Sequence, residues 1–333
     1  MIDQSNLWAV VPVAGFGSRL RPHTYTRPKP LLPVAGQPII GHILDQLVPL
    51  GVRRVVLVIG YMGELIVDYV QSRRDFDRVE WVEQKELLGL GHAIALTRAV
   101  VGDDPLLMVY GDTIFRADLP SLLTDVGSGS IGVKRVDDPR RFGVVVREGS
   151  RVTRLVEKPD EFVSDQAIVG VNYIRDSSHL YRCLAELLGR QKRSRGEYQL
   201  TDALQMMVEE GAHLESFPVD NWFDCGTKET MLATNRHLLE GNSVPATDGR
   251  FVAVPPVYID PSAQIESSVI GPYVSVGAGA CVRSAMVRNT IVGEQAVVEN
   301  ALVEDSLIGF QSRLKGRWGR FNISDLSEIS SWK

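Results

Sequence analysis

The sequence is poor in cysteine, and its cysteines are far apart. The three residues, Cys183, Cys225 and Cys281, form no CxxC pair. Zinc sites and disulfide frameworks use closely spaced cysteines, so we expect neither. Free thiols are typical of a reducing compartment, and we therefore expect a cytoplasmic protein.

Long apolar runs are also missing. No apolar segment approaches the roughly 18 residues that a membrane-spanning helix needs, and the N-terminus has no basic region followed by an apolar run. We expect neither a membrane span nor a signal peptide. The net charge of −5 argues against a general binder of nucleic acid or of membrane surfaces.

Acidic residues are absent between Asp3 and Asp45. The basic residues in that stretch are Arg19, Arg21, Arg27 and Lys29. A solvated basic surface loop is one interpretation. Cations that lie beside a glycine turn and have no acidic neighbours favour the other, which is binding of a polyphosphate.

The glycine turn at residues 15–17 lacks parts of two common phosphate loops. A dinucleotide-binding turn has a third glycine and opens a helix at once, whereas Pro22 follows this turn. A Walker-type loop needs Gly-Lys-Ser/Thr, which is not present. Prolines at positions 22, 28, 30 and 33 prevent a long helix. The segment therefore favours an extended loop around a triphosphate.

Buried strands alternate with helices through the first half of the chain. The predicted strands cover residues 7–14, 55–60, 79–84 and 106–112, and the first predicted helix covers residues 38–51. This order indicates an α/β fold, with a mixed, mainly parallel sheet between helices. Residues 141–146 and 151–159 are predicted to form an antiparallel pair. Ligands of such folds bind at the carboxyl ends of the parallel strands.

An aliphatic residue recurs every six residues after Gly241. The matching positions are Ile259 and Ile265, then Ile270, Val276 and Val282, then Val292 and Val298. This period indicates a β-helix of short parallel strands, and a hairpin-rich β domain is the alternative. We interpret the offsets between these groups as turn irregularities. The predicted domains are residues 1–241 and 242–333.

Several motifs between residues 5 and 240 resemble those of the sugar-1-phosphate nucleotidyltransferases. In family order they are "GFGSRLRPHTYTRPKPLLPVAGQPI", "QKELLGLGHA", "YGDTIF", "FGVV", "VEKP", "RGEYQLTDAL" and "WFDCGT". The resemblance implies a Rossmann-like nucleotidyltransferase domain. The β-helix would be left-handed, as in part of the family. It also implies an enzyme that joins a nucleoside triphosphate to a sugar 1-phosphate and releases pyrophosphate.

The resemblance implies a role for each matched residue. The nucleotide would bind Ala14, Gly15, Gly17, Ser18, Gln84 and Gly89; the catalytic residues would be Arg19, Lys29 and Asp112; Mg²⁺ would bind Asp112 and Asp224; the sugar phosphate would contact Gly143, Glu157, Lys158 and Asn172. Considered alone, Asp112 is better explained as an aspartate in a turn. The presence of a second matching aspartate, Asp224, favours the alternative that both bind the metal. A surface ion pair is the alternative for Glu157 and Lys158, and a polar core residue is the alternative for Asn172.

Gln84 carries most of the information about the base. A glutamine presents a donor and an acceptor that match uracil or thymine. Pyrimidine-specific members of the family have a glycine five residues after this glutamine, and Gly89 stands at that position in this sequence. "GFGSRLRP" is closer to the mannose-1-phosphate guanylyltransferases, and Ala14 replaces a glycine usual in thymidylyltransferases. We expect glucose 1-phosphate with dTTP, and UTP as a close alternative.

Two other classes of protein remain as alternatives. A β-helix acyltransferase would use a histidine on the repeat, but the last histidine, His237, precedes it. A homologue without catalytic activity would be expected to lack one of the four charged residues Arg19, Lys29, Asp112 and Asp224, and all are present. We expect the β-helix to join copies of the chain into a homo-oligomer.

Overall fold

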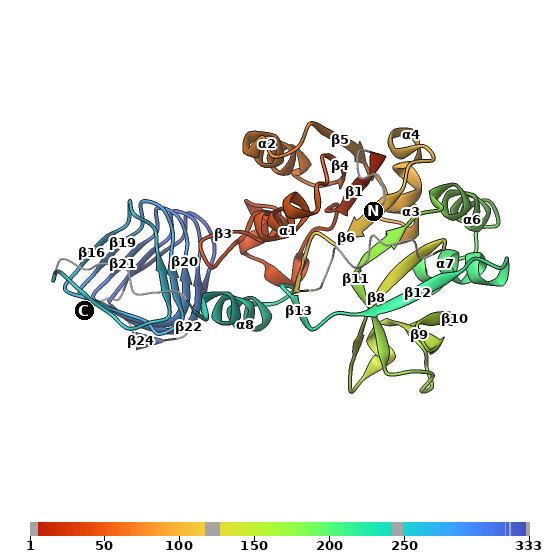
Figure 1. Cartoon of the computed structure of the whole chain (residues 1–333). Helices are drawn as coiled ribbons and strands as arrows, with labels where there is room; N and C mark the ends of the chain where they lie inside the picture. The colour runs from red at the N-terminus through yellow and green to blue at the C-terminus, as the bar shows by residue number, and fades with distance from the viewer. Residues whose placement is uncertain (1–5, 117–126, 242–248, 317, 320, 331–333) are drawn as a thin grey trace. The chain divides into compact units, whose positions relative to one another are not determined.

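The structure, a computed structural model, describes residues 6–116, 127–241, 249–316, 318–319 and 321–330 (Figure 1). Contacts within the backbone divide the chain into two compact units. The first consists of Met1–Gly15 and Ile43–Trp222, and the second of Phe16–His42 and Phe223–Lys333. Over these described ranges, no helix has the length and apolar character needed to cross a membrane.

A nine-stranded sheet lies at the centre of the first unit, in the order β5-β4-β1-β6-β11-β8-β12-β10-β9. The first four strands in this order are β5 (Arg78–Glu83), β4 (Arg54–Ile59), β1 (Trp8–Pro12) and β6 (Leu106–Val109), and they are mutually parallel. The others are β11 (Gln166–Ile174), β8 (Gly129–Arg135), β12 (Leu214–Pro218), β10 (Arg151–Glu157) and β9 (Gly143–Glu148). The four parallel strands form the predicted β-α-β arrangement.

The sequence had indicated a mainly parallel sheet, but the remaining half of the sheet is mainly antiparallel. Only β12 and β8 pair in parallel there, and the other neighbouring strands are antiparallel. The reason is the connections: β9 and β10 are joined by a tight turn, which can link only antiparallel strands. The predicted antiparallel pair of residues 141–146 and 151–159 is confirmed.

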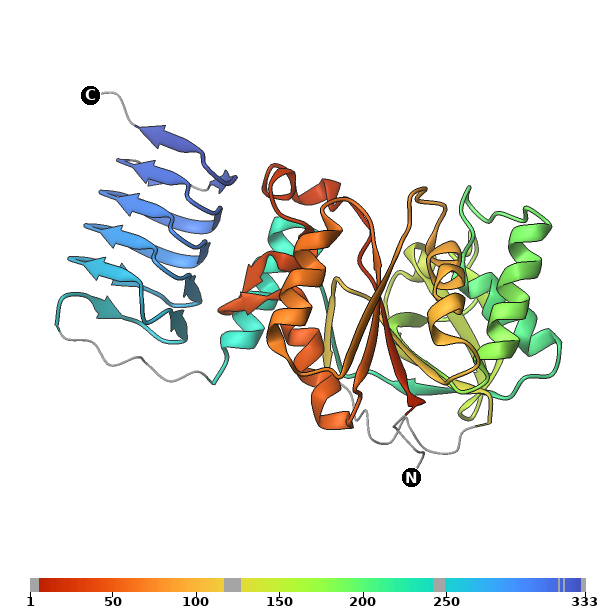
Figure 2. The ribbon, with the colours of Figure 1, turned by 90° about the horizontal axis from the view of Figure 1, so that it is seen from above.

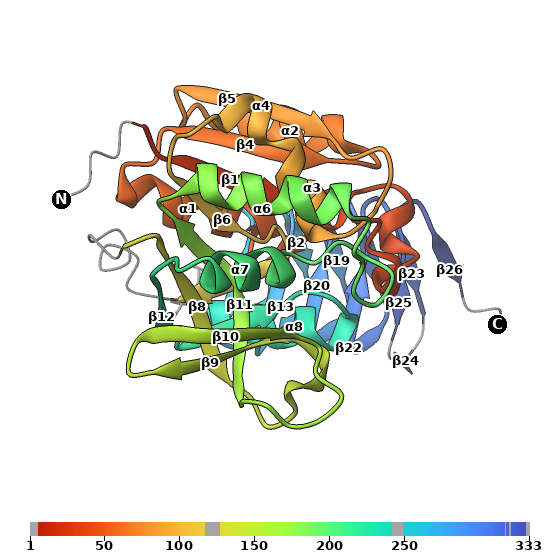
Figure 3. The same cartoon turned by 90° about the vertical axis from the view of Figure 1, so that its right-hand side faces the viewer.

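Helices cover the sheet of the first unit. They are α2 (Gly63–Arg73), α3 (Leu90–Leu96), α4 (Arg98–Val101), α6 (Ser177–Gly189) and α7 (Leu200–Glu209). Figure 3 shows α6 and α7 side by side, and their buried side chains form one cluster with those of the sheet. The residue that caps α7 is Gln199.

Helix α1 (Ile39–Leu47) confirms the predicted apolar stripe. Its buried residues are Ile39, Ile40, Ile43, Leu44 and Leu47, each with no exposed surface. Pro38 was expected in its first turn, but it belongs to β3 (Gln37–Pro38), which pairs with β2 (Pro33–Val34). Gly51 has φ of 74° and ends the 3-10 turn after α1, as expected at the end of this segment.

The second unit contains α8 (Lys228–Leu239) and a long series of short strands. The strands are β14 (Val252–Ala253), β15 (Val257–Ile259), β16 (Gln264–Glu266), β17 (Val269–Ile270), β18 (Val274–Val276), β19 (Cys281–Arg283), β20 (Met286–Val292), β21 (Val297–Glu299), β22 (Leu302–Ile308), β23 (Arg313–Lys315), β24 (Trp318–Gly319), β25 (Asn322–Ile323) and β26 (Glu328–Ser330). Every pairing described among them is parallel. Figure 2 shows them stacked in successive coils.

The register explains the aliphatic period. Val282, Val298 and Leu314 lie above one another on adjacent strands and are fully buried. Val287 and Val292, which lie between Val282 and Val298 in the sequence, are also buried. Each coil thus has three inward positions, which are separated by five or six residues. The offsets interpreted from the sequence as irregularities are therefore part of the repeat.

Three expectations about this region stay predictions: the left-handed sense of the coil, the boundary between residues 241 and 242, and the association of copies through these strands. Residues 242–248, where the second domain would begin, lie outside the described residues.

The coil core provides a test of the packing. Leu314→Ala removes a fully buried side chain, and we expect it to lower the free energy of unfolding by about 2–5 kcal/mol. Leu326→Ala, at a side chain that is 67% exposed, is the matched control and should change it by less than about 0.5 kcal/mol. Urea unfolding measures both. Equal effects of the two variants would contradict the buried register of Leu314.

Candidate functional site

Several of the predicted site residues lie at one edge of the first unit's sheet. Ala14 and Gly15 follow β1, Gln84 follows β5 and Asp112 follows β6. These strands are parallel, and the amide of Gly111 donates to the carbonyl of Pro12 at 3.3 Å, so the ends of β1 and β6 are adjacent. This is the edge at which a parallel sheet binds its ligands.

Open space lies beside Gly15. The residue is exposed, and a Cβ built on it meets no atom within 4 Å. Nearby Gly60 is different, because a Cβ there would lie 2.5 Å from the carbonyl oxygen of Ala14. Gly60 is therefore needed for packing within the protein, whereas the packing around Gly15 gives no reason for a glycine. A ligand that approaches the backbone closely would give one.

Gln84 and Gly89 lie together, as their predicted role requires. The Gln84 side chain is buried, and its Nε2 donates to the carbonyl of Gly89 at 3.1 Å. Gly89 has φ of 106°, and a Cβ there would lie 2.7 Å from the carbonyl oxygen of Tyr198. His92 Nδ1 lies 3.2 Å from Gln84 Nε2. His92 thus belongs to this group.

Tyr110 is a residue of the site that the motifs did not reveal. Burial raises the pKa of its hydroxyl strongly, and the negative charges of Glu157 and Asp112 raise it further. The hydroxyl therefore stays protonated at neutral pH, and it is under the influence of both the carboxylate predicted to bind metal and the one predicted to bind sugar.

A compact polar group surrounds Glu157. Thr201 Oγ1 donates to Glu157 Oε2 at 2.7 Å, and Lys158 Nζ lies 3.3 Å from Glu157 Oε1. Gly143 faces Glu157 across β9 and β10, and a Cβ there would lie 2.7 Å from Thr201 Oγ1 and 2.9 Å from Glu157 Oε2. Three of the predicted sugar-phosphate residues are therefore in one place. Thr201, to which the motifs assigned no role, orients the carboxylate.

Asn172 lies deeper than its predicted role suggests. It has no exposed surface and sits on β11 beside Tyr110. Its burial favours the alternative of a polar core residue, and its contact with a sugar stays a prediction.

The second unit brings together the charged residues of the signature segment, residues 16–42. Gly17 has φ of 61° and caps the 3-10 turn Ser18–Leu20, in which Ser18 and Arg19 are exposed. Lys29 is only 8% exposed, and its Nζ lies 3.7 Å from Asp224 Oδ1. The two charges offset each other, with the ammonium largely withdrawn from water and the carboxylate partly exposed.

Gly226 is the close neighbour of this ion pair. A Cβ built on Gly226 would lie 2.8 Å from both Arg19 Nη2 and Asp224 Oδ1. The guanidinium and the carboxylate thus both lie beside a residue that has no side chain. Asp112, the other predicted metal ligand, belongs to the first unit.

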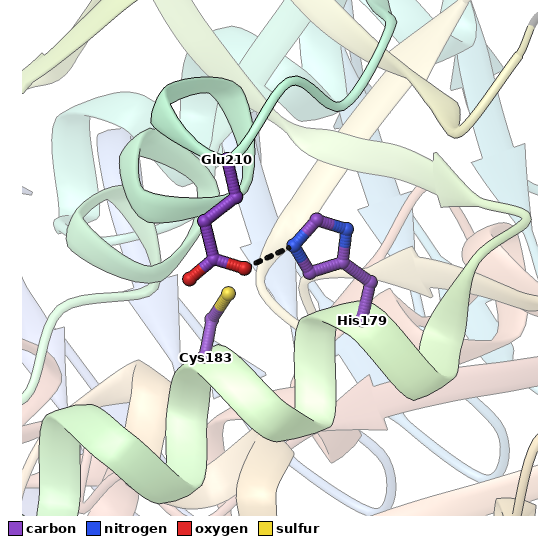
Figure 4. A group of neighbouring side chains, drawn as sticks. All are labelled: His179, Cys183 and Glu210. Carbon is purple, nitrogen blue, oxygen red and sulfur yellow. Dashed lines mark hydrogen bonds and ion pairs between the residues drawn. The ribbon is translucent and has the colours of Figure 1, made fainter.

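A group on α6 and α7 has the residue types of a metal site, but its chemistry differs from that predicted for Mg²⁺. Ligand atoms of His179, Cys183 and Glu210 lie within 4.8 Å of one another (Figure 4). Glu210 Oε2 accepts from His179 at 2.9 Å and from Arg182 at 2.6 Å. Burial raises the pKa of Cys183 to about 11. A protonated thiol and a carboxylate paired with arginine do not suit a hard cation, and these contacts instead join α6 to α7.

Comparison with known proteins agrees with this geometry. The profile of the nucleotidyl transferase family matches residues 8–241. The chain is 31% identical over 307 residues to the low-salt glycan biosynthesis nucleotidyltransferase Agl11 of Haloferax volcanii, covering 83% of this chain and 85% of that one. It is 32% identical to the UTP–glucose-1-phosphate uridylyltransferase AglF of the same organism, covering 70% and 96%.

A solved structure extends the comparison to the fold. A Bacillus anthracis chain assigned as a glucose-1-phosphate thymidylyltransferase superposes with a TM-score of 0.61 at 26% identity, covering 72% of this chain and 98% of that one. The protein therefore belongs to the nucleotidyl transferase family.

The space beside Gly15 provides a test of the nucleotide site. Gly15→Ala adds a methyl group that contacts nothing in the protein, so we expect the free energy of unfolding to change by less than about 1 kcal/mol. Affinity for dTTP or UTP should fall at least about tenfold, because the methyl occupies the space of the ligand. Calorimetric titration measures the affinity. Gly189→Ala, also in open space, is the control, and unchanged affinity in Gly15→Ala would contradict this location.

Proposed function

We propose that the protein transfers a nucleotidyl group from a nucleoside triphosphate to a sugar 1-phosphate and releases pyrophosphate. The observation that carries the proposal is that Arg19 and Asp224 lie beside Gly226 while Lys29 pairs with Asp224. A homologue without catalytic activity would be expected to have lost one of these charged residues. Membership of the nucleotidyl transferase family supports the same reaction.

The proposed mechanism is charge neutralisation and positioning. The phosphate oxygen of the sugar attacks the α-phosphorus in line, and the bond to the pyrophosphate oxygen breaks. A phosphate dianion is already nucleophilic, so no side chain has to remove a proton. Arg19, which is exposed, neutralises the departing β- and γ-phosphates. Lys29 acts where charge increases on the α-phosphate, and its burial strengthens the interaction.

We propose that Asp112 and Asp224 each give a carboxylate oxygen to Mg²⁺. The ion would polarise the phosphate oxygens when bound. Asp112 is half-buried and is oriented by Thr113 Oγ1 at 3.1 Å, and the Asp224 side chain is 41% exposed. Both thus offer accessible oxygen atoms, which suits a hard cation that keeps part of its water shell.

The group around Glu157 fits a sugar 1-phosphate. Thr201 holds one carboxylate oxygen of Glu157, which leaves the carboxylate in a fixed orientation to accept hydrogen bonds from sugar hydroxyls. Lys158 is 39% exposed at its side chain and can turn its ammonium to the phosphate. Gly143 keeps the space beside them free of a side chain.

We propose a pyrimidine nucleotide, dTTP ahead of UTP, and glucose 1-phosphate. The proximity of Gln84 and Gly89 supports the base assignment, since a side-chain amide and a backbone peptide group can together read one edge of a pyrimidine. The named activities of the relatives support glucose 1-phosphate. Mannose-1-phosphate guanylyl transfer is the alternative.

A substrate panel tests this proposal. Pyrophosphate release is measured with dTTP, UTP, GTP, ATP and CTP against the 1-phosphates of glucose, mannose, galactose and N-acetylglucosamine. We expect higher kcat/KM for dTTP and UTP than for the other nucleotides with glucose 1-phosphate, because Gln84 can match thymine and uracil, and we expect dTTP ahead of UTP. A maximum for GTP with mannose 1-phosphate would establish the alternative. No release with any pair would refute the enzymatic function.

The metal assignment has its own test. Asp112→Asn removes a charge while keeping the shape of the side chain, and we expect kcat/KM to fall at least about 100-fold, with a higher Mg²⁺ concentration for half-maximal rate. Asp103→Asn, at an exposed aspartate before β6, is the control and should keep the wild-type rate. Full Mg²⁺-dependent activity in Asp112→Asn would remove Asp112 from the metal site.

A further inference from the structure

The signature segment is tied to the last coils of the C-terminal strands, about 300 residues later in the chain. We define the loop–coil junction as His23, Thr26 and Arg27 on the segment and Glu294, Asn322, Ser324 and Asp325 on the coils. His23 Nε2 bonds Asn322 Oδ1, and Thr26 Oγ1 donates to Asp325 Oδ2. Ser324 Oγ donates to the carbonyl of Pro22 at 2.8 Å. All of these residues belong to the second unit.

An ion pair completes the junction. Arg27 Nη2 lies 2.9 Å from Glu294 Oε2, and the guanidinium stacks over the Phe310 ring at 4.6 Å. Asp325 is itself fixed, because its Oδ1 accepts from the amide of Phe310 at 2.7 Å. Asp325, which accepts from Thr26, is therefore anchored to the coil backbone.

The junction holds the segment mainly by polar contacts. His23 is only 4% exposed, and burial lowers the pKa of its ring against the opposing effects of Asn322 and Asp325. A neutral ring has one N–H, and Nε2 can give it to Asn322. Beside these contacts is a small, partly open cavity with apolar walls from Leu32, Met231 and Leu307.

The held turn supports the nucleotide-binding residues directly. Thr24 follows His23, is 3% exposed, and its Oγ1 donates to the carbonyl of Gly17 at 3.0 Å. A Cβ on Gly17 would lie 3.0 Å from both Thr24 Cγ2 and Lys29 Cβ. Gly17 thus rests on the turn that the coils hold. A shift of this turn moves the backbone of Gly17 and the stem of Lys29 together.

We propose that Thr26, Asn322 and Asp325 are positioning residues for nucleotidyl transfer, which act by holding the signature segment in its nucleotide-binding conformation. This inference rests on the proposed function. The three residues touch no phosphate themselves. Their loss leaves the group around Glu157 intact, so the effect falls on the nucleotide and spares the sugar 1-phosphate.

The test compares two substitutions of one residue. Thr26→Val keeps the shape and removes the hydroxyl donor, whereas Thr26→Ser keeps the donor. We expect Thr26→Val and Asp325→Ala to raise KM for the nucleotide about tenfold, equivalent to about 1.4 kcal/mol, and to leave KM for the sugar 1-phosphate within twofold. Thr26→Ser should stay within twofold of wild type for both substrates.

A matched pair of charge variants separates positioning from folding. Glu294→Gln weakens the junction, and Glu266→Gln weakens an ion pair with Arg283 on the coils that does not involve the segment. We expect only Glu294→Gln to raise the nucleotide KM, with similar thermal unfolding temperatures for both. Unchanged nucleotide KM in the folded Thr26→Val and Asp325→Ala variants would overturn the proposal. So would equal losses for both substrates together with a lower unfolding temperature.

Binding measurements keep this test independent of turnover. Calorimetric titration of the same variants with dTTP and UTP gives the nucleotide Kd without a second substrate. If wild type binds nucleotide but shows no turnover, the proposed function fails, and a weaker Kd for Asp325→Ala still supports the junction. If wild type turns over and the variants bind as tightly as wild type, the junction fails and the function stands.

Discussion

The arrangement of the second unit depends on the ion pair between Lys29 and Asp224. Lys29 is almost fully buried, and a buried ammonium is stable only beside a negative charge. Asp224 ends β13 (Asn221–Asp224), so the pair fixes the signature segment to the part of the chain that leads into α8. Asn235 of α8 continues the connection, since its Oδ1 accepts from the amide of Ala35 at 2.9 Å and from Ser275 Oγ at 2.6 Å.

Local patterns in the sequence were enough to predict most secondary structure and part of the site. The apolar stripe of α1 and the strands that precede Gly15, Gln84 and Asp112 follow from side-chain periodicity alone. Because parallel strands end at one edge, their order in the chain also predicts that these residues share that edge. Gln84 and Gly89 are close in sequence, and their contact was predictable from spacing.

Contacts that depend on distant segments were not predictable in this way. Thr201 and Gly226 have ordinary positions in their motifs, and only the folded chain shows that one orients Glu157 and the other lies against Arg19. Apart from the antiparallel pair β9–β10, the pairing in the sheet's second half could not be derived either, because hairpin and crossover strands have similar apolar patterns. The aliphatic residues of the coil were interpreted as recurring every six residues. The actual repeat is a coil of about 16 residues with three unequal sides, which a single sequence does not show.

The sequence separation within the loop–coil junction has a consequence for synthesis of the protein. His23 and Asn322 are 299 residues apart. At the usual elongation rate of about 5–20 residues per second, the coil strands leave the ribosome roughly 15–60 s after the segment they hold. The sheet of the first unit can form in that interval, but the segment's polar partners do not yet exist. A nascent chain therefore carries the signature segment without its polar partners until the last coils have been synthesised.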